Sequence, residues 1–277
     1  MMPRILAIGG SDSSGGAGVQ ADVKTITALG GYAATVVTAL TAQNTHEIAD
    51  IFDVDVYFID QQLEAVLGDV GADVIKLGML RNYRVVKAVA KRVLGAGIPL
   101  VLDPVVLSSS GSELLDKRGQ QALVEQLLPH VAVLTPNIPE AQLLTGVAIA
   151  DLDGMRLAAD YLLAMGAGAV VVKGGHLPPP QESGGEDNLV DVLRTADGEE
   201  SLFYSPRQFN RHTHGTGCTF ASAIATGIAE GLTLRDAVAR AQIYVAGAIR
   251  HAPGIGGGIG PLNHCHALGA LEKDRTS

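Results

Sequence analysis

The amino-acid sequence predicts an α/β fold in which helices cover both faces of a mostly parallel sheet. Short apolar runs alternate along the chain with longer runs whose apolar residues recur at helical spacing. Continuous apolar runs, as opposed to alternating ones, are typical of strands buried on both faces, as in parallel sheets. Hydrophobic residues make up 47% of the 277 residues and charged residues 18%, which is enough for a large core. We therefore expect one three-layer α/β/α domain over residues 1–277.

The first part of the chain contains four predicted strands separated by three predicted helices. The strands are short and rich in Val, Ile, Leu and Thr, and the helices place their apolar residues three or four positions apart. The expected strands are Arg4–Ile8, Ala34–Leu40, Ala72–Leu77 and Pro99–Leu102. The expected helices are Val19–Leu29, Ile59–Leu67 and Val85–Leu94.

The second part of the chain continues this pattern with one interruption. Strands are expected at Val131–Leu134 and Ala169–Val172, with a helix through Leu157–Met165 between them, and two helices follow at Thr216–Glu230 and Leu234–Ile249. The interruption, residues 177–205, has loops at Pro178–Pro180 and Ser183–Gly185. Leu189–Leu193 and Glu200–Ser205 then predict a small antiparallel element at the sheet edge, and residues 267–277 predict a flexible tail.

Charge and cysteine content exclude several classes of function. The chain has 20 Lys and Arg against 29 Asp and Glu, a net charge of −9, which argues against nucleic acid as a partner. The N-terminus is a poor signal peptide, and no stretch approaches the roughly 18 apolar residues of a membrane span. Two cysteines, Cys218 and Cys265, are typical of a reducing compartment, so we expect a cytoplasmic protein with no membrane contact.

The glycine-rich loop after the first strand, Gly9–Gly18, resembles a dinucleotide fingerprint only superficially. Gly16, Gly18 and Ala21 match the spacing, but polar residues separate them from the strand. The acid required after the second strand is also missing, because that strand runs into Thr41–Asn44. The chain has no Gly-Lys dipeptide and hence no Walker A loop. The loop is therefore either a flexible connection or a place where backbone approaches a small ligand.

Polar residues follow three of the later predicted strands. In parallel sheets, ligands bind outside the carboxyl ends of the strands, which draws attention to Asp103, Asn137, Glu140 and Lys173. Asn137 and Glu140 can help to hold Mg²⁺ beside phosphates, or they can form an ordinary helix capping box. Lys173 can direct its ammonium at a phosphate, or it can be a solvated residue before a turn.

The most specific segment is the turn that precedes the first C-terminal helix. Gly215, Thr216 and Gly217 leave the first N–H groups of an apolar helix unobstructed, which predicts an anion site. Cys218 falls in the first turn, where the helix dipole favours a thiolate and makes this residue a candidate base or polar anchor. The alternative for Cys218 is a buried structural thiol.

The histidines are less informative. His212 and His214 flank the turn, and His264 and His266 lie near the C-terminus. Neither pair has the ligand spacing of a structural zinc site, so we expect no metal centre at either place.

Taken together, the motifs resemble the hydroxymethylpyrimidine kinase/phosphomethylpyrimidine kinase family of the ribokinase-like superfamily. The matching segments follow the family order over nearly the whole chain, and the set is far more specific than any single motif. They are Gly10–Thr25, Thr38–Thr45, Lys76–Leu80, Asp103–Val105, Leu134–Glu140, Val172–Leu177, His214–Thr219 and Gly260–His264.

The resemblance implies a ribokinase-like three-layer sandwich and a kinase that uses ATP and Mg²⁺. Its expected reaction is phosphorylation of 4-amino-5-hydroxymethyl-2-methylpyrimidine to the monophosphate and then the diphosphate, in thiamine biosynthesis. A loose phosphoryl-transfer transition state needs positioning and charge neutralisation more than a strong base, which is compatible with a cysteine at the reacting end.

By match of motif, the resemblance also implies three groups of site residues. The pyrimidine pocket is formed by Gln43 and Met79, bordered by Asp22 and the Gly10 loop. The anion hole is Gly215, Thr216 and Gly217, followed by Cys218, where sugar kinases of the superfamily carry a catalytic Asp. The phosphates are surrounded by Lys173, Asn137, Glu140 and Asp103, of which Asp103 and Glu140 are the expected Mg²⁺ ligands, through water.

Two departures from the family pattern and several alternatives remain open. Gln242 stands where relatives often carry a Lys, which puts the second phosphorylation in doubt, and Leu77 replaces an expected Thr. The alternative functions are a pyridoxal or pyridoxine kinase and a non-catalytic sensor of the pyrimidine. We expect a homodimer in which a partner covers the edge strands within Leu189–Ser205, and Gly254–Gly260 is one candidate for the adenine pocket.

Overall fold

The computed structural model describes residues 1–107, 113–175, 188–266 and 268. The predicted loops at Pro178–Pro180 and Ser183–Gly185 lie outside the described residues, as does the predicted tail apart from residue 268.

The described strands form one nine-stranded sheet in the order β3-β2-β1-β4-β5-β6-β7-β8-β9. In this order, the six consecutive strands β2, β1, β4, β5, β6 and β7 are parallel to one another. At one edge β3 is antiparallel to β2, and at the other β8 and β9 are antiparallel to their neighbours. Their bounds are β1 (Arg4–Asp12), β2 (Tyr32–Gln43), β3 (Ile48–Asp53), β4 (Val74–Leu77), β5 (Leu100–Leu102), β6 (Val133–Leu134), β7 (Ala169–Val172), β8 (Asn188–Thr195) and β9 (Glu200–Pro206).

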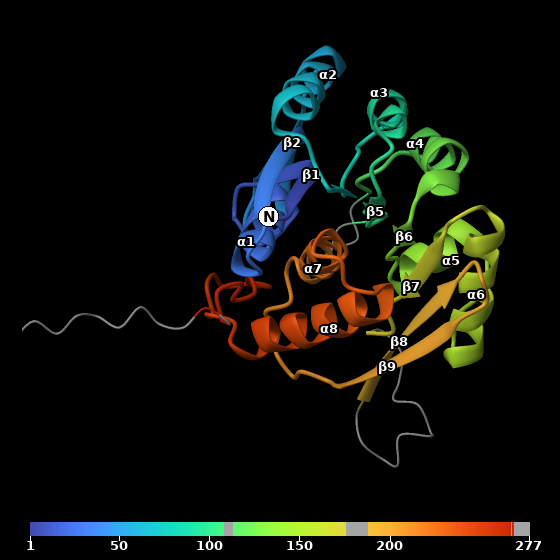
Figure 1. The fold of residues 1–277 in the computed structure, drawn as a ribbon. Helices are drawn as coiled ribbons and strands as arrows, with labels where there is room; N and C mark the ends of the chain where they lie inside the picture. The colour runs from blue at the N-terminus through green and yellow to red at the C-terminus, as the bar shows by residue number, and fades with distance from the viewer. Residues whose placement is uncertain (108–112, 176–187, 267, 269–277) are drawn as a thin grey trace, which may run out of the picture.

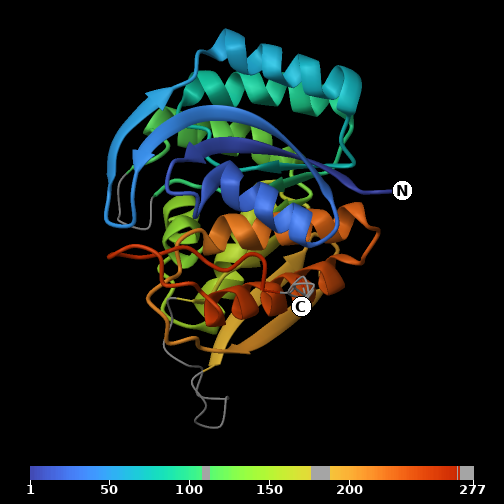
Figure 2. The same ribbon diagram turned by 90° about the vertical axis from the view of Figure 1, so that its left-hand side faces the viewer.

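Helices cover both faces of this sheet, as Figures 1 and 2 show. One buried apolar cluster joins the sheet to the helices from α2 to α6, and a second joins it to α1, α7 and α8. The first set is α2 (Val56–Ala65), α3 (Tyr83–Val93), α4 (Lys117–Ala122), α5 (Ile138–Thr145) and α6 (Leu152–Ala164). The second set is α1 (Gly18–Ala28), α7 (Thr216–Ala229) and α8 (Leu234–Arg250). The predicted three-layer architecture with a mostly parallel sheet is therefore confirmed.

Strand β3 and helix α4 were not expected from the sequence, and helix α5 was anticipated only through the capping-box alternative for Asn137 and Glu140. Strand β3 lies at the sheet edge, where its residues are half-buried or exposed, so it lacks a continuous apolar run. Helices α4 and α5 have only six and eight residues, too few for a clear helical repeat. The predicted antiparallel element at the other edge is present as β8 and β9.

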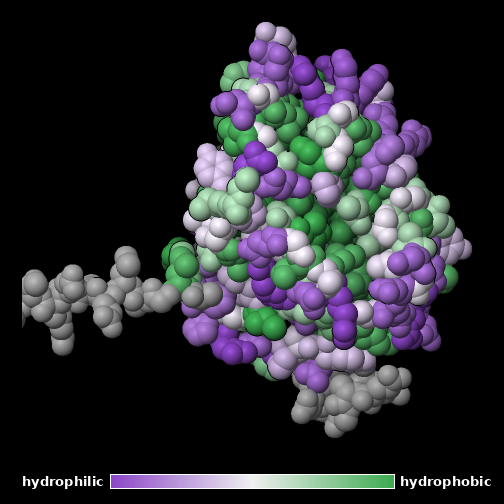
Figure 3. Space-filling model, viewed as in Figure 1, coloured by the Kyte–Doolittle hydropathy of each residue, from purple (hydrophilic) through white to green (hydrophobic). Residues whose placement is uncertain are grey.

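In the view of Figure 3, apolar residues form a band down the middle of the face, and polar residues gather at its margin and across its lower part. Within the described residues, no helix is long and apolar enough to cross a membrane.

The connection between β1 and α1 shows how the chain builds a tight loop at the carboxyl edge of the sheet. The carboxylate of Asp12 accepts hydrogen bonds from the backbone N–H groups of Ser14, Gly16 and Ala17 at 2.8–3.0 Å. Gly18 has φ +56°, and a Cβ there would lie 2.2 Å from the carbonyl oxygen of Gly10. Only glycine allows this approach, so the glycine-rich sequence specifies a fixed loop, and the flexible alternative is not needed.

Candidate active site

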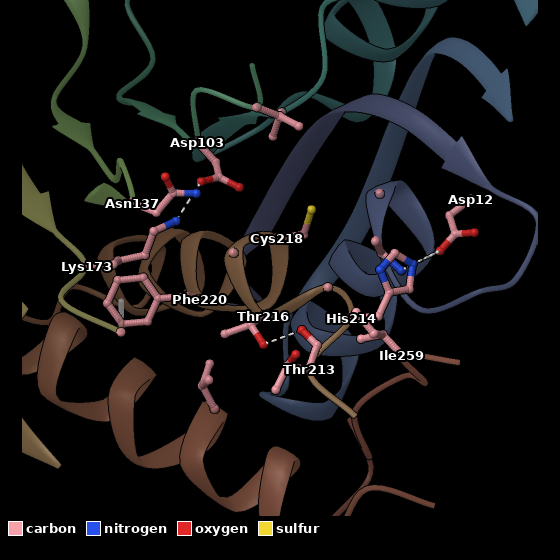
Figure 4. Close-up of a pocket in the computed structure, with 18 of the residues that line it drawn as sticks. Asp12, Asp103, Asn137, Lys173, Thr213, His214, Thr216, Cys218, Phe220 and Ile259 are labelled. Carbon is pink, nitrogen blue, oxygen red and sulfur yellow. Dashed lines mark hydrogen bonds and ion pairs between the residues drawn. The ribbon is translucent and has the colours of Figure 1, made fainter. Parts of the chain in front are cut away.

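A cavity of about 790 Å³ opens at the carboxyl edge of the parallel strands and is closed on one side by the N-terminus of α7. Figure 4 shows Cys218 between two groups of polar side chains, one around Lys173 and the other around His214. Every predicted site residue lines this cavity: Gly10, Asp22, Gln43, Met79, Asp103, Asn137, Glu140, Lys173, Gly215, Thr216, Gly217 and Cys218.

The first group of side chains is built around an ion pair. Lys173 Nζ donates to Asp103 Oδ1 at 3.0 Å, and both side chains are largely buried. Burial alone would lower the pKa of Lys173, but the charges of Asp103 and Glu140 outweigh it and hold that pKa above its ordinary value. Lys173 is therefore a permanent cation at the cavity wall, not a solvated residue before a turn.

The N-terminus of α7 comes close to this ion pair because two of its residues are glycines. A Cβ on Gly217 would lie 3.2 Å from Asp103 Oδ2 and 3.3 Å from Lys173 Nζ. Gly215 has φ +88°, and a Cβ there would lie 1.9 Å from the carbonyl oxygen of Gly16. The helix begins at Thr216 with no side-chain cap on its first N–H groups. A positive helix end and a lysine ammonium thus face the same space, which suits an anion.

Asn137 and Glu140 form the capping box that the sequence allowed. Asn137 Oδ1 accepts from Glu140 N, and a Glu140 carboxylate oxygen accepts from Asn137 N, both at 2.9 Å. Burial raises the pKa of Glu140 to about 8; Lys173 opposes this rise, and the charge of Asp103 adds to it. The capping role is therefore real, and any contribution to metal binding comes in addition to it.

The environment of Cys218 contradicts the expected thiolate. Burial raises the pKa of Cys218 to about 11, and the nearby ammonium of Lys76 only partly opposes that rise. The carboxylates of Asp22 and Asp103 raise it further. The prediction of a dipole-stabilised thiolate was wrong because desolvation and two negative charges outweigh the helix end. At neutral pH Cys218 is a thiol.

Close to Cys218 lies a buried ion pair between Lys76 and Asp22 that the sequence analysis missed. Lys76 Nζ donates to both carboxylate oxygens of Asp22 at 2.8 and 3.0 Å, and Ser222 Oγ donates to one of them at 2.7 Å. The side chains of Lys76 and Asp22 are 1% and 0% exposed. Burial alone would lower the pKa of Lys76, but Asp22 outweighs it and keeps the ammonium charged. The available signal was a lysine inside the apolar run of β4.

The second group of side chains surrounds Gln43. Gln43 Nε2 lies 3.2 Å from His214 Nε2, which lies 2.8 Å from Asp12 Oδ2. Met79 forms an apolar wall beside them, so close to the chain that a Cβ on Gly10 would lie 2.4 Å from Met79 Cε. Asp12 and His214 were not among the predicted site residues, because only the folded chain brings them to Gln43.

The segment Gly254–Gly260 lies on the Gln43 side of the cavity. Gly258 N donates to Thr45 Oγ1 at 3.1 Å, and Ile259 N donates to the Thr45 carbonyl at 2.8 Å. This placement, over the turn between β2 and β3, does not support an adenine pocket in that segment.

Gln242 lies toward the Lys173 side of the same cavity. Its Nε2 donates to Asp191 Oδ2 at 3.2 Å and to the Phe203 carbonyl at 3.1 Å. Asp191 also accepts from Gly174 N at 2.9 Å. Gln242 therefore supplies a neutral donor to a carboxylate near the ion pair of Lys173.

Among the residues that the structure describes, no three His, Cys, Asp or Glu side chains are grouped closely enough to hold a metal ion. A magnesium site here would have to combine protein carboxylates with oxygens of a bound phosphate, which is how Mg²⁺ is commonly held.

Comparisons with known proteins agree with this geometry. Residues 12–263 match the family described as phosphomethylpyrimidine kinase. The chain is 43% identical over 267 residues to the hydroxymethylpyrimidine/phosphomethylpyrimidine kinase of Streptomyces coelicolor, covering 96% of each protein. It is 47% identical over 262 residues to the thiamine biosynthesis bifunctional protein ThiED of Geobacter sulfurreducens, covering 94% of this chain but only 52% of that longer protein.

Among solved structures, the chain is similar to the pyridoxal kinase of Staphylococcus aureus in complex with AMP-PCP and pyridoxal. The two have 29% sequence identity and a TM-score of 0.87, and the match covers 98% of this chain and 96% of the other. The fold is thus that of the ribokinase-like kinases, which use ATP as phosphate donor. With its higher identity to the pyrimidine kinases over nearly its whole length, the chain belongs to the phosphomethylpyrimidine kinase family, a family of phosphotransferases.

Proposed function

We propose that this protein transfers phosphate from ATP to 4-amino-5-hydroxymethyl-2-methylpyrimidine, and then to the resulting monophosphate. The observation that carries the proposal is one cavity with two chemically distinct ends and Cys218 between them. One end offers an amide and an apolar wall, which suit a small heteroaromatic ring. The other offers a lysine ammonium and a helix N-terminus, which suit phosphates.

At the ring end, Gln43 and Met79 would hold the pyrimidine, with the Gly10 backbone and Asp22 at its border. An amide has a donor and an acceptor side by side, which complement a ring nitrogen next to an amino group. Asp22 is fully engaged by Lys76 and Ser222, so its part is to hold the floor of the pocket and not to bind the ring directly.

At the phosphate end, Lys173 and the N–H groups of Gly215–Cys218 would stabilise the transferred phosphoryl group. Asp103 and Glu140 would hold Mg²⁺ through water, beside Asn137. Asp103 fits this role as an ordinary carboxylate ligand next to phosphate oxygens, and Glu140, with a pKa of about 8, would have to lose its proton when the ion binds. When bound, the ion would neutralise charge on the phosphates. Asp103 already faces the cavity through its ion pair with Lys173.

The neutral thiol of Cys218 limits the mechanism. A thiol with a pKa of about 11 cannot remove the alcohol proton as a resting thiolate. Its role would be to orient the hydroxyl, whose proton leaves late because a loose transition state has little bond formation to the nucleophile. In the second step the attacking group is an already ionised phosphate oxygen, which needs no base.

The substrate is tested by comparing kcat/KM for the hydroxymethylpyrimidine and for pyridoxal, both with MgATP. The proposal expects a preference for the pyrimidine. The structural similarity to pyridoxal kinases makes pyridoxal the second candidate, and a reversed preference would replace the proposed substrate. Binding of the pyrimidine without turnover of either compound would favour a sensor.

We also propose a cytoplasmic homodimer. The cysteines Cys218 and Cys265 are free thiols, as suits a reducing compartment. Leu40 and Phe52 lie directly opposite one another on β2 and β3 and are exposed, with Tyr57 exposed nearby on α2. This apolar surface favours the β2–β3 edge as the dimer interface, in place of the β8–β9 edge that the sequence suggested. Sedimentation of Phe52→Glu tests the proposal, which expects monomers.

A further inference from the structure

Three polar residues from distant parts of the chain form a connected row at the ring end of the cavity. Asp12 ends β1, Gln43 ends β2, and His214 precedes α7. His214 Nε2 lies 2.8 Å from Asp12 Oδ2 and 3.2 Å from Gln43 Nε2. Asp12 and His214 have no part in the transfer of phosphate described above.

The position of the His214 ring is fixed by its surroundings. The ring lies against Gly16, where a Cβ would come within 2.5 Å of His214 Cδ2. The backbone N–H of His214 donates to the carbonyl of Gly260 at 3.1 Å. The backbone of His214 is therefore tied to Gly260, and its ring packs against the loop that contains Gly16.

Asp12 is equally fixed, and it is negatively charged. Ser14, Gly16 and Ala17 donate backbone hydrogen bonds to its carboxylate, as described above. Burial alone would raise the pKa of Asp12, but hydrogen bonds from His214, Ser14 and Ala17 outweigh it and hold that pKa well below its usual range.

This charge decides where the proton of His214 lies. A bare ring nitrogen 2.8 Å from a carboxylate oxygen would place two lone pairs against each other, so Nε2 carries the proton. An Nε2–H cannot accept from an N–H of Gln43. The single Nε2–H is directed at Asp12, and Gln43 can share it in a three-centre bond only through an oxygen. The two ends of the amide lie 3.2 Å from His214 Nε2 and 3.2 Å from Thr41 Oγ1, and exchanging its O and N atoms turns Oε1 toward His214 and Nε2 toward Thr41. That hydroxyl is free to accept because it gives its own proton to the Ser11 carbonyl at 3.0 Å.

We propose that His214, held by Asp12, is a positioning residue that locks the side-chain amide of Gln43 in one orientation. This inference rests on the proposed function in one respect, namely that Gln43 contacts the ring. The locked amide offers the substrate a donor from Nε2 and an acceptor from Oε1 in fixed order. A 4-aminopyrimidine, with its ring nitrogen as acceptor and its amino group as donor, matches that order. The 4-oxo analogue, with an N–H and a carbonyl, presents the reverse order.

The test compares kcat/KM for the 4-amino substrate and its 4-oxo analogue in the wild type and in His214→Leu. Since a neutral hydrogen bond is worth about 0.5–1.5 kcal/mol and 1.4 kcal/mol is tenfold, freeing the amide to rotate should reduce the preference for the 4-amino ring by about tenfold. In a Gln43→Ala background, His214→Leu should leave the preference unchanged. His212→Leu is the matched control, because His212 lies in the same turn and accepts from Gly260 N but makes no hydrogen bond to Asp12 or Gln43.

Equal losses for both rings in His214→Leu, with an unchanged preference, would show a merely structural role and overturn the proposal. A change in preference that persists in the Gln43→Ala background would overturn it as well. A second readout does not depend on the reaction. Nitrogen-15 NMR of the free protein should find the proton of His214 on Nε2 and a Gln43 amide proton close to Thr41. A bare Nε2 would contradict the inference even if no pyrimidine is phosphorylated.

Discussion

Removing either partner of the buried pair between Lys76 and Asp22 should destabilise the fold, with opposite dependence on pH. The two changes are Lys76→Met and Asp22→Asn, each of which leaves one ionisable group behind. Both side chains are at most 1% exposed, so a charge left alone there is strongly disfavoured. We expect the remaining group to become neutral instead of staying charged.

The size of each effect follows from the cost of neutralising the remaining group. Protonating Asp22 at pH 7 costs about 4 kcal/mol, from a solution pKa of about 3.9 at 1.36 kcal/mol per unit, and about 1.5 kcal/mol at pH 5. Deprotonating Lys76 costs about 4.6 kcal/mol at pH 7, from a solution pKa of about 10.4, and about 2 kcal/mol at pH 9. The loss in Lys76→Met therefore shrinks as pH falls, and the loss in Asp22→Asn shrinks as pH rises.

The assay is urea unfolding followed by circular dichroism at pH 5, 7 and 9, because the chain has no tryptophan to serve as a fluorescent probe. The wild type provides the reference at each pH. Losses in the free energy of unfolding that do not change with pH, or that change in the same direction in both variants, would refute the assignment of a charged pair. The double variant Lys76→Met, Asp22→Leu should be more stable than either single variant.

Three further predictions concern the reacting end of the cavity. Cys218→Ala should slow the first phosphorylation more than the second, since only the first has an alcohol as the attacking group. Equal losses in the rates of monophosphate and diphosphate formation would exclude a role of Cys218 in orienting that alcohol. Iodoacetamide should modify Cys218 far more slowly than the exposed Cys265 at pH 7, and the rate at Cys218 should still rise above pH 9, because the pKa of Cys218 is about 11. Mass spectrometry of the two peptides measures both rates, and a rate at Cys218 that levels off below pH 8 would contradict this prediction. Gln242→Lys places an ammonium beside Asp191 near Lys173 and should speed formation of the diphosphate relative to the monophosphate; an unchanged ratio would show that position 242 does not affect the second transfer.

The buried strands and the antiparallel pair β8 and β9 could be predicted from the sequence, whereas the edge strand β3 could not. β1 and β7 contain continuous apolar runs covered on both faces, and β4 is interrupted only by Lys76; such runs have few other interpretations. β3 lies at an edge, where solvent accepts polar residues, and its pairing with β2 depends on a turn. Its position in the sheet therefore follows from tertiary packing more than from its own residues.

The site shows the same division between local and distant effects. Lys173 and Gly217 could be identified because each lies at the end of a strand or the start of a helix, where parallel folds place ligands. The charge state of Cys218 could not, because it depends on Asp22 and Asp103, which approach it only in the folded chain. The contact of His214 with Asp12 joins residues 202 positions apart and has no local signal.

The most direct test of the proposed kinase is a time course of the reaction followed by phosphorus-31 NMR. The purified protein is mixed with 4-amino-5-hydroxymethyl-2-methylpyrimidine and MgATP, and the monophosphate and diphosphate are resolved as they form. We predict that the monophosphate appears first, then falls as the diphosphate accumulates, with one ADP formed for each phosphate transferred. Consumption of ATP without either pyrimidine product, or no consumption at all, would contradict the proposed function.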